Sequence, residues 1–174
     1  GLTLELGGKA ANIVFNDAAI DQAVEGVVNG IFFNQGHVCC AGSRLVLQED
    51  IHDEFVTKLE KRMQSLRVGN PLDKNTDIGA INSKEQLDKI TNLVNEGVKE
   101  GGSIFQTDCE LPQNGFWFKP TLFTNAQPSY RISREEIFGP VLTTLTFRAP
   151  EEAIEISNNT EYGLSAGIWT EKGS

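Results

Sequence analysis

The sequence has few cysteines, few positive charges and no long hydrophobic run, and each of these shortages excludes a class of protein. Its three cysteines are an odd number in which Cys39 and Cys40 are adjacent and Cys109 is remote. That pattern suits neither a disulfide framework nor a zinc site, so we expect no metal and a reducing, cytoplasmic location. Positive charge is also scarce, with 15 Lys and Arg against 24 Asp and Glu and a net charge of -9. Because nucleic-acid binders carry basic patches, we expect no such partner.

Long hydrophobic runs are absent as well. The longest apolar stretch, 24–33, is interrupted by a glutamate, an asparagine and two glycines, whereas a membrane span needs about 20 apolar residues. The first residues lack the basic region of a signal peptide, so we expect neither membrane insertion nor export. The chain also has no initiator methionine and stops without a closing element. We therefore expect it to be cut at both ends.

Hydrophobic residues make up 39% of the 174 residues, which is enough for one domain with a single core. Hydrophobic periodicity and turn residues predict alternating strands and helices. Strands are predicted at 11–15, 44–48, 103–106, 116–118, 121–123, 141–147 and 165–169. Helices are predicted from an N-cap at Asp17 to about 34, at 52–66, from a cap at Ser83 to about 100, and at 151–158. This alternation predicts an α/β fold with a largely parallel sheet and flanking helices.

The adjacent cysteines follow an apolar helix and precede Ala-Gly-Ser. On composition alone, such a pair is more often two buried small hydrophobic residues. Here the glycines on both sides predict a tight turn, where a thiol can face a cleft and free backbone N–H groups can stabilise an oxyanion. His37 is the nearest base, but it is two residues from Cys39 on the same turn, and we expect it to point elsewhere.

Glu5 is a better candidate for the base that a cysteine nucleophile needs. It lies between Leu4 and Leu6 and precedes two glycines. Burial in such an apolar run would raise the pKa of its carboxyl toward the range useful for general-base catalysis. A structural role for a buried carboxylate is the alternative, and the residues leave both open.

The segment Glu135-Glu136-Ile137-Phe138-Gly139-Pro140 combines acids, an aromatic residue and a turn. Glu136 could hold a ribose and Phe138 could contact a flat ring, although a helix-terminal acid and a core Phe are the simpler reading. The Gly7-Gly8-Lys9 sequence is weak as a phosphate loop because it lacks the full glycine spacing and a following Ser or Thr.

Gly163-Leu164-Ser165-Ala166-Gly167 matches the Gly-x-Ser-x-Gly pattern of serine hydrolases. Those enzymes place their catalytic histidine after the serine, whereas His37 and His52 both precede Ser165. No helix is predicted directly after it, so we reject this interpretation.

Taken together, the motifs resemble the aldehyde dehydrogenase superfamily, in order from Leu4 almost to the end of the chain. The Glu-Leu-Gly-Gly-Lys segment resembles the family's glutamate motif, and Phe-Asn-x-Gly-x-x-Cys-x-Ala-Gly-x-Arg resembles its cysteine motif. Glu-Glu-Ile-Phe-Gly-Pro resembles its cofactor-contacting motif, and Asn-Asn-Thr-Glu-Tyr-Gly-Leu-Ser-Ala resembles a structural stretch of the family.

The resemblance implies a role for each matched residue. Cys39, rather than Cys40, falls on the nucleophile and Glu5 on the general base. Glu136 falls at the nicotinamide-ribose hydroxyls and Phe138 near the nicotinamide ring. We expect two further cofactor contacts, at Leu6 and Gly7.

The implied reaction oxidises a small-molecule aldehyde to a carboxylic acid, with NAD or NADP as hydride acceptor and a cysteine thiohemiacetal and thioester as intermediates. The chain would be a partial catalytic domain, residues 1–174, in which 1–9 are the tail end of a missing cofactor-binding domain and a C-terminal part is also missing. The parent enzyme would be a homo-oligomer, a dimer or a tetramer.

Two observations qualify this expectation. His37 and Val38 stand where many relatives carry Gln and another small or sulfur-bearing residue, so the pocket beside the nucleophile would differ. The chain also contains no phosphate-binding turn of the kind a dinucleotide needs. The alternative function is therefore a catalytically silent fragment or a pseudoenzyme unit with a structural or interaction role.

Overall fold

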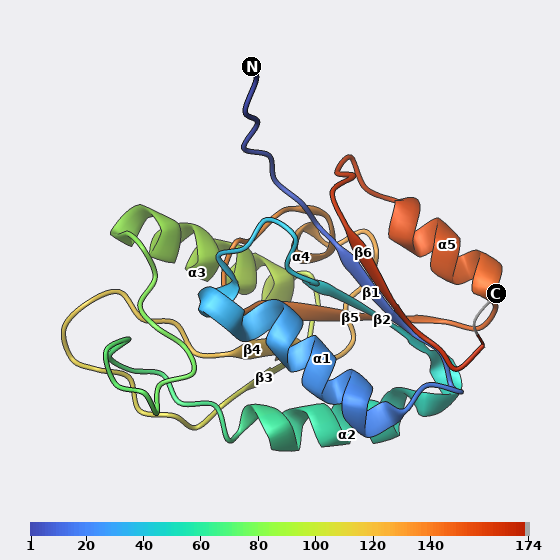
Figure 1. The fold of residues 1–174 in the computed structure, drawn as a ribbon, viewed down its shortest axis with the longest axis horizontal. Coiled ribbons are helices and arrows are strands. Elements are labelled where there is room, and N and C mark those ends of the chain that lie inside the picture. The colour runs from blue at the N-terminus through green and yellow to red at the C-terminus, as the bar shows by residue number, and fades with distance from the viewer. Residues whose placement is uncertain (173–174) are drawn as a thin grey trace.

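The computed structural model describes residues 1–172 and contains one six-stranded sheet with helices on both faces (Figure 1). The strand order is β3-β4-β5-β2-β1-β6, and every neighbouring pair is parallel except β3 with β4. The predicted α/β class with a largely parallel sheet is confirmed. The strands are β1 (Ala11–Val14), β2 (Arg44–Gln48), β3 (Ile104–Gln106), β4 (Thr121–Phe123), β5 (Val141–Phe147) and β6 (Ala166–Trp169).

The helices divide into two layers, one on each face of the sheet (Figure 1). The α-helices are α1 (Ile20–Phe32), α2 (His52–Met63), α3 (Lys84–Lys99), α4 (Arg131–Arg134) and α5 (Pro150–Asn158), with short 3-10 turns at Phe33–Gly36 and Glu49–Ile51. Helices α1 and α2 cover one face, on which Leu45, Leu47 and Leu142 are buried. Helices α3 and α4 cover Val141 and Leu145 on the other face, beside α5. Successive residues of β5 thus supply opposite cores, as the alternation of a strand requires.

Most of the predicted elements are confirmed, including the Ser83 cap of α3, whose hydroxyl accepts the Gln86 N–H at 3.1 Å. Two predictions are wrong. The N-cap of α1 is Ala19 without a side-chain bond, because the Asp17 carboxylate instead accepts the Thr170 hydroxyl. Residues 116–118 form no strand, because the Phe116 carbonyl accepts the Ile81 N–H from a loop. The short helix α4 was not predicted, since four residues are too few to show a period.

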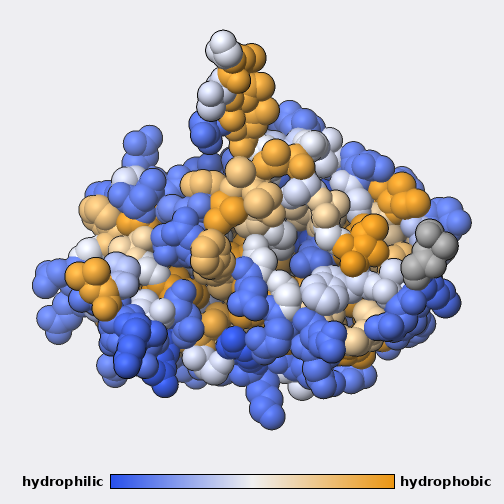
Figure 2. Space-filling view, in the orientation of Figure 1, coloured by the Kyte–Doolittle hydropathy of each residue, from blue (hydrophilic) through white to orange (hydrophobic). Residues whose placement is uncertain are grey.

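The N-terminal segment, residues 1–6, extends away from the body of the molecule (Figure 1). Its leucines are more than half exposed, and the segment is the apolar projection in the space-filling view (Figure 2). Below this projection the same face has further apolar residues, and hydrophilic residues lie mainly around its periphery (Figure 2). Among residues 1–172, no helix combines the length and the apolar character that crossing a bilayer would demand.

Candidate active site

The turn that carries the two cysteines begins with a backbone reversal after α1. Asn34, Gln35 and Gly36 all have positive φ, of 49°, 48° and 75°. An added Cβ on Gly36 would lie 2.1 Å from the carbonyl oxygen of Gly139, so only glycine fits this close approach. The reversal therefore brings the cysteine turn directly against the turn that contains Phe138 and Gly139.

Cys39 and Cys40 occupy a tight turn closed by a hydrogen bond from the Ala41 N–H to the Val38 carbonyl at 3.0 Å. The predicted turn is confirmed. Both thiols are exposed and free, so the alternative of a buried hydrophobic pair is wrong for this chain. Within the described residues, no hydrogen bond uses the Cys39 N–H, which leaves this donor available to a ligand.

The glycines that follow Glu5 join the cysteine turn to Glu136. The Gly8 N–H donates to Glu136 Oε1 at 3.0 Å. An added Cβ on Gly8 would lie 2.4 Å from the Cys39 carbonyl, and one on Gly7 would lie 2.4 Å from Glu136 Oε2. Three segments that are far apart in the sequence therefore meet at the two glycines, and no side chain separates them.

Helix α3 holds the 135–139 turn in place. The Gln86 side-chain amide donates to the carbonyls of Ile137 and Phe138, at 2.9 and 3.0 Å. Phe138 has a φ of 55°, a left-handed conformation that costs a non-glycine residue energy and persists only where its surroundings fix it. Here the two hydrogen bonds from the Gln86 side chain and the contact between Gly36 and Gly139 fix the conformation of Phe138.

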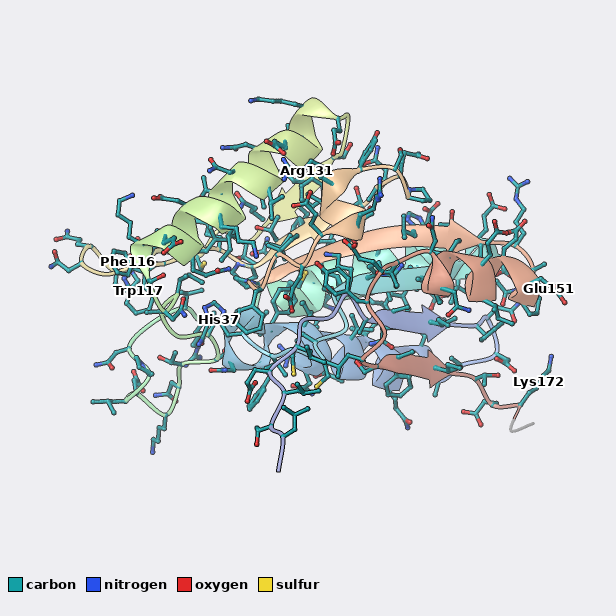
Figure 3. The ribbon with its side chains drawn as sticks, turned by 90° about the horizontal axis from the view of Figure 1, so that it is seen from above. His37, Phe116, Trp117, Arg131, Glu151 and Lys172 are labelled. Atoms are coloured by element: carbon teal, nitrogen blue, oxygen red, sulfur yellow. The ribbon has the colours of Figure 1, made fainter. Side chains whose placement is uncertain are left out.

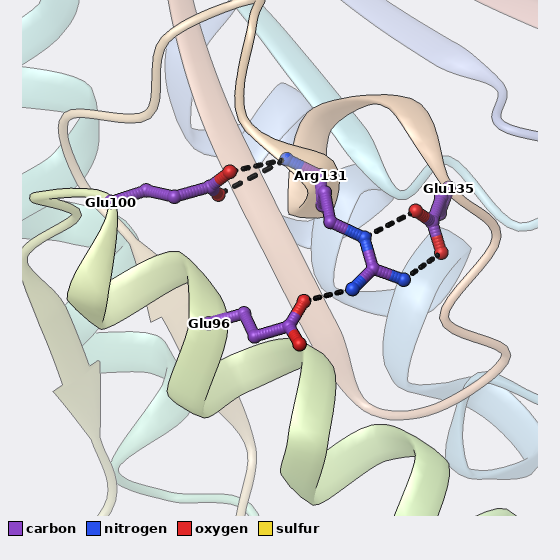
Figure 4. Close-up of polar contacts among 4 residues, drawn as sticks. All are labelled: Glu96, Glu100, Arg131 and Glu135. Carbon is purple, nitrogen blue, oxygen red and sulfur yellow. Dashed lines mark hydrogen bonds and ion pairs between the residues drawn. The ribbon is translucent and has the colours of Figure 1, made fainter.

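A second anchor joins the same turn to α3 and α4 through Arg131 (Figure 4). Its guanidinium binds both carboxylate oxygens of Glu135, at 2.5 and 2.9 Å, and also contacts the Glu96 carboxylate. Its backbone N–H donates to Glu100 at 3.1 Å. The hydrogen bonds from Arg131 lower the pKa of Glu135, which therefore stays ionised beside Glu136.

His37 contacts Phe138 and not the cysteines. The two rings stack with centroids 5.1 Å apart and an interplanar angle of 28°. Its Nε2 accepts the Asn82 N–H at 3.4 Å, and within residues 1–172 no hydrogen bond joins it to Cys39. Burial lowers the pKa of His37, which favours the neutral ring. Figure 3 shows His37 at the same end of the molecule as Phe116 and Trp117, opposite Glu151 and Lys172.

Glu5 does not have the environment that its sequence predicts. Its side chain is exposed, as are Leu4 and Leu6, at 62% and 61%. The segment precedes β1, which begins at Ala11, and residues 1–6 lie outside the sheet and the three core clusters. The expectation that an apolar run buries Glu5 is therefore wrong for this chain. Leu6, expected to contact the cofactor, is equally exposed.

Lys9 and Arg44 are two buried cations that the sequence interpretation did not single out. The Arg44 guanidinium donates to the carbonyls of Lys9, Ile156 and Ser157, each at 2.8 Å. Lys9 is 1% exposed, and its ammonium has no hydrogen-bond partner in the part of the chain that the structure describes. Burial, reinforced by the nearby Arg44 charge, lowers the pKa of Lys9 to about 7. A lysine directly before the apolar run 10–15 is the signal that could have indicated this burial.

No cluster of three or more His, Cys, Asp or Glu side chains suited to a metal occurs among residues 1–172. What the structure does assemble is an exposed cysteine on a tight turn, a carboxylate bonded to a glycine loop, and a constrained aromatic ring. These features define an α/β protein with the elements of a thiol-based site at the N-terminal ends of three inner parallel strands, β1, β2 and β5.

Comparisons with known proteins identify the family. A model of the aldehyde dehydrogenase family matches residues 1–174, so the chain belongs to this family. It is 45% identical over 169 residues to an aldehyde dehydrogenase of Emericella nidulans, and 43% identical over 174 residues to a betaine aldehyde dehydrogenase of Bacillus subtilis. Those alignments cover 97% of this chain and 34% and 35% of the relatives. The chain thus spans about a third of their length.

Solved structures agree with the sequence matches. The crystal structure of an NAD-dependent aldehyde dehydrogenase from Sinorhizobium meliloti superimposes with a TM-score of 0.93 at 40% identity. A betaine aldehyde dehydrogenase from Staphylococcus aureus in complex with NAD+ superimposes with a TM-score of 0.92 at 37% identity. Each alignment covers 97% of this chain and 34% of the solved chain.

Proposed function

We propose that residues 1–174 are part of the catalytic domain of an enzyme that oxidises an aldehyde to a carboxylic acid, with Cys39 as its nucleophile. Residues 1–9 would be the end of its cofactor-binding domain. One observation carries the proposal: Gly7 and Gly8 contact both the Cys39 backbone and the Glu136 carboxylate. The three motifs that resemble the family's site therefore meet at one point.

The residues present fit one end of a nicotinamide cofactor. Gly7 packs directly against Glu136 Oε2 and the Gly8 N–H donates to Oε1, so the two glycines fix the carboxylate that would receive the ribose hydroxyls. We propose that Glu136 and Gly7 contact the ribose, that Phe138 lies near the ring, and that Leu6 adds an apolar contact. NAD or NADP would be the hydride acceptor, and the similar solved structures in complex with NAD+ favour NAD.

The chemistry of this chain centres on Cys39. Its thiolate would attack the aldehyde carbon to give a thiohemiacetal, and the free Cys39 N–H would donate to the oxyanion that forms. After oxidation at the same carbon, a thioester links the acyl group to the sulfur. An ordinary thiol, with a pKa of about 8.5, is only a few per cent ionised at neutral pH, so Cys39 must be activated within the complete site.

Glu5 would activate the water that hydrolyses the thioester and releases the acid. A general base must lie within hydrogen-bond reach of the proton that it removes. Here Glu5 belongs to an exposed segment that other parts of the enzyme would have to cover and orient. We therefore propose that the 174-residue chain alone is catalytically silent and that activity belongs to the longer enzyme.

Three further properties of that enzyme are proposals. Its substrate would be a small-molecule aldehyde, as the names of the relatives suggest. Its oligomeric form would be a dimer or a tetramer of identical chains. Its compartment would be the reducing cytoplasm, which suits three free thiols, two of them exposed.

Alkylation of the purified chain with iodoacetamide tests the assignment of the nucleophile. We expect Cys39 to react faster than Cys40, which is also exposed, and both to react faster than the partly buried Cys109. The rates are read by mass spectrometry of peptides after timed quenching. Faster labelling of Cys40 would contradict the assignment of Cys39 as the nucleophile. Aldehyde-dependent NAD reduction by the chain alone would contradict the proposal that the chain by itself is catalytically inactive.

A further inference from the structure

A cavity lies next to the cysteine turn, against β1, β6 and the end of α5. It has a volume of about 290 Å³, and its walls include Lys9, Arg44, Ser157, Asn158, Tyr162 and Ser165. None of the residues that line it is Asp or Glu, although the chain as a whole has a net charge of -9. The charged side chains in the cavity wall are therefore all basic, although the protein as a whole is acidic.

Neither cation in its wall forms an ion pair with another described residue, although the Glu136 and Glu135 carboxylates are near enough to act on Lys9 and raise its pKa. The three nitrogens of the Arg44 guanidinium donate hydrogen bonds to the backbone carbonyls of Lys9, Ile156 and Ser157. The Lys9 ammonium bonds to nothing, and no ion pair within residues 1–172 includes either residue. A buried charge without a partner is expensive, so it either loses its proton or binds an ion of opposite sign.

We infer that this cavity is a binding site for a small oxyanion, a phosphate or a carboxylate, with Lys9 as its main charged contact. The volume is about ten times the share of one water molecule in the liquid, which is ample for a group of four or five heavy atoms. Lys9 and Arg44 supply positive charge, while Ser157, Asn158 and Tyr162 offer neutral polar groups at the wall.

The titration of Lys9 is consistent with such a ligand. Desolvation and the Arg44 charge, opposed by the Glu136 and Glu135 carboxylates, hold its pKa at about 7, so near neutrality the ammonium loses its proton easily. A bound anion would favour the charged form and raise this pKa. Binding should therefore weaken as the pH rises above 7, because the free site then has to take up a proton.

Thermal unfolding of the purified chain with added inorganic phosphate tests the site. At ten times its dissociation constant, phosphate should raise the unfolding midpoint by about 3–6 °C. The shift should be absent in Lys9→Met, which removes the charge at similar volume, and present in Lys84→Met, a control at an exposed lysine of α3. Equal shifts in both variants would overturn the proposal.

A second pair of variants decides the matter even if Lys9→Met does not fold. Asn158 and Asn159 are adjacent and exposed, but only Asn158 lines the cavity. Asn158→Asp adds a negative charge to the wall and should abolish the phosphate shift, whereas Asn159→Asp should keep it. Equal shifts in the two Asp variants would overturn the proposal.

Sodium acetate in place of phosphate distinguishes the two kinds of oxyanion. A shift with acetate that disappears in Asn158→Asp assigns a carboxylate site, and a shift with phosphate alone assigns a phosphate site. Acetate stays ionised above neutral pH, so any weakening of its binding between pH 7 and pH 9 reports on the protein. No shift with either ion, at any concentration short of general salt effects, would overturn the proposal.

Discussion

Glu136 and Glu5 are the two acidic residues proposed for the site, and their segments differ in how far the rest of the chain holds them. Glu136 lies in a turn that Gln86, Arg131 and Gly36 hold from three sides, and its carboxylate accepts the Gly8 N–H. Glu5 lies in a segment that is exposed at every residue from 1 to 6. Both residues lie in sequence motifs that resemble those of the family.

The difference shows that a motif gives the identity of a residue but not its surroundings. The 135–139 turn finds its partners, α3, α4 and the cysteine turn, within this chain, so its geometry is complete. The partners of the Glu5 segment are not among residues 7–172. In the longer enzyme that we propose, segments outside residues 1–174 would have to cover and orient Glu5.

The largest expected effect on stability is at Gly36, where the cysteine turn meets the 135–139 turn. Gly36→Ala places a Cβ against the Gly139 carbonyl at a φ of 75°, and two backbones must then separate. We expect the free energy of unfolding to fall by about 2–4 kcal/mol in urea denaturation. Gly163→Ala, where an added Cβ meets nothing within 4 Å, is the matched control. Equal losses in the two variants would show that the two turns are not held by this contact.

The next effect is at Lys9, where the exposed segment enters the protein. Its pKa is about 7 in the folded chain against an ordinary 10.5, so between these values the unfolded chain binds a proton that the folded chain does not. Stability from this group is therefore lost as the pH falls from 10.5 toward 7, and gained as it rises. Urea denaturation at pH 7 and pH 9 should show the gain in the native chain and a smaller one in Lys9→Met. The same pH dependence in both would contradict the burial of an unpartnered Lys9.

A smaller effect is expected at Gln86, the anchor of Phe138. Gln86→Met keeps the length of the side chain but leaves the Ile137 and Phe138 carbonyls without their donor. We expect a loss of about 1–2 kcal/mol in the free energy of unfolding. Glu85→Ala, at an exposed position of the same helix, should change stability by less than about 0.5 kcal/mol. If Gln86→Met were as stable as this control, Phe138 would be fixed by other contacts.

Much of the fold follows from local patterns. The parallel sheet, α1 to α3, α5 and the Ser83 cap were all predictable, because hydrophobic period and capping residues act within a few positions. Helix α4 and the absence of a strand at 116–118 were not. They depend on contacts with Glu100 and Ile81, which are distant in the sequence.

The candidate site shows the same division. Glycines around the cysteines indicated a turn, and the structure has one. The stacking of His37 on Phe138 and the burial of Lys9 follow from how the turns pack in three dimensions, which no local pattern encodes. The predicted burial of Glu5 is wrong, because flanking leucines bury a residue only where another surface covers them, and Leu4 and Leu6 are exposed.

The most direct test of the central claim compares two neighbouring thiols in the longer enzyme. Cys39→Ala and Cys40→Ala each remove an exposed thiol from one turn, so we expect similar effects on folding. With an aldehyde and NAD as substrates, we predict that Cys39→Ala lowers kcat by at least about 1,000-fold, as loss of a nucleophile does, whereas Cys40→Ala stays within a few-fold of the native enzyme. Retention of activity in Cys39→Ala, or its loss in Cys40→Ala alone, would contradict the account.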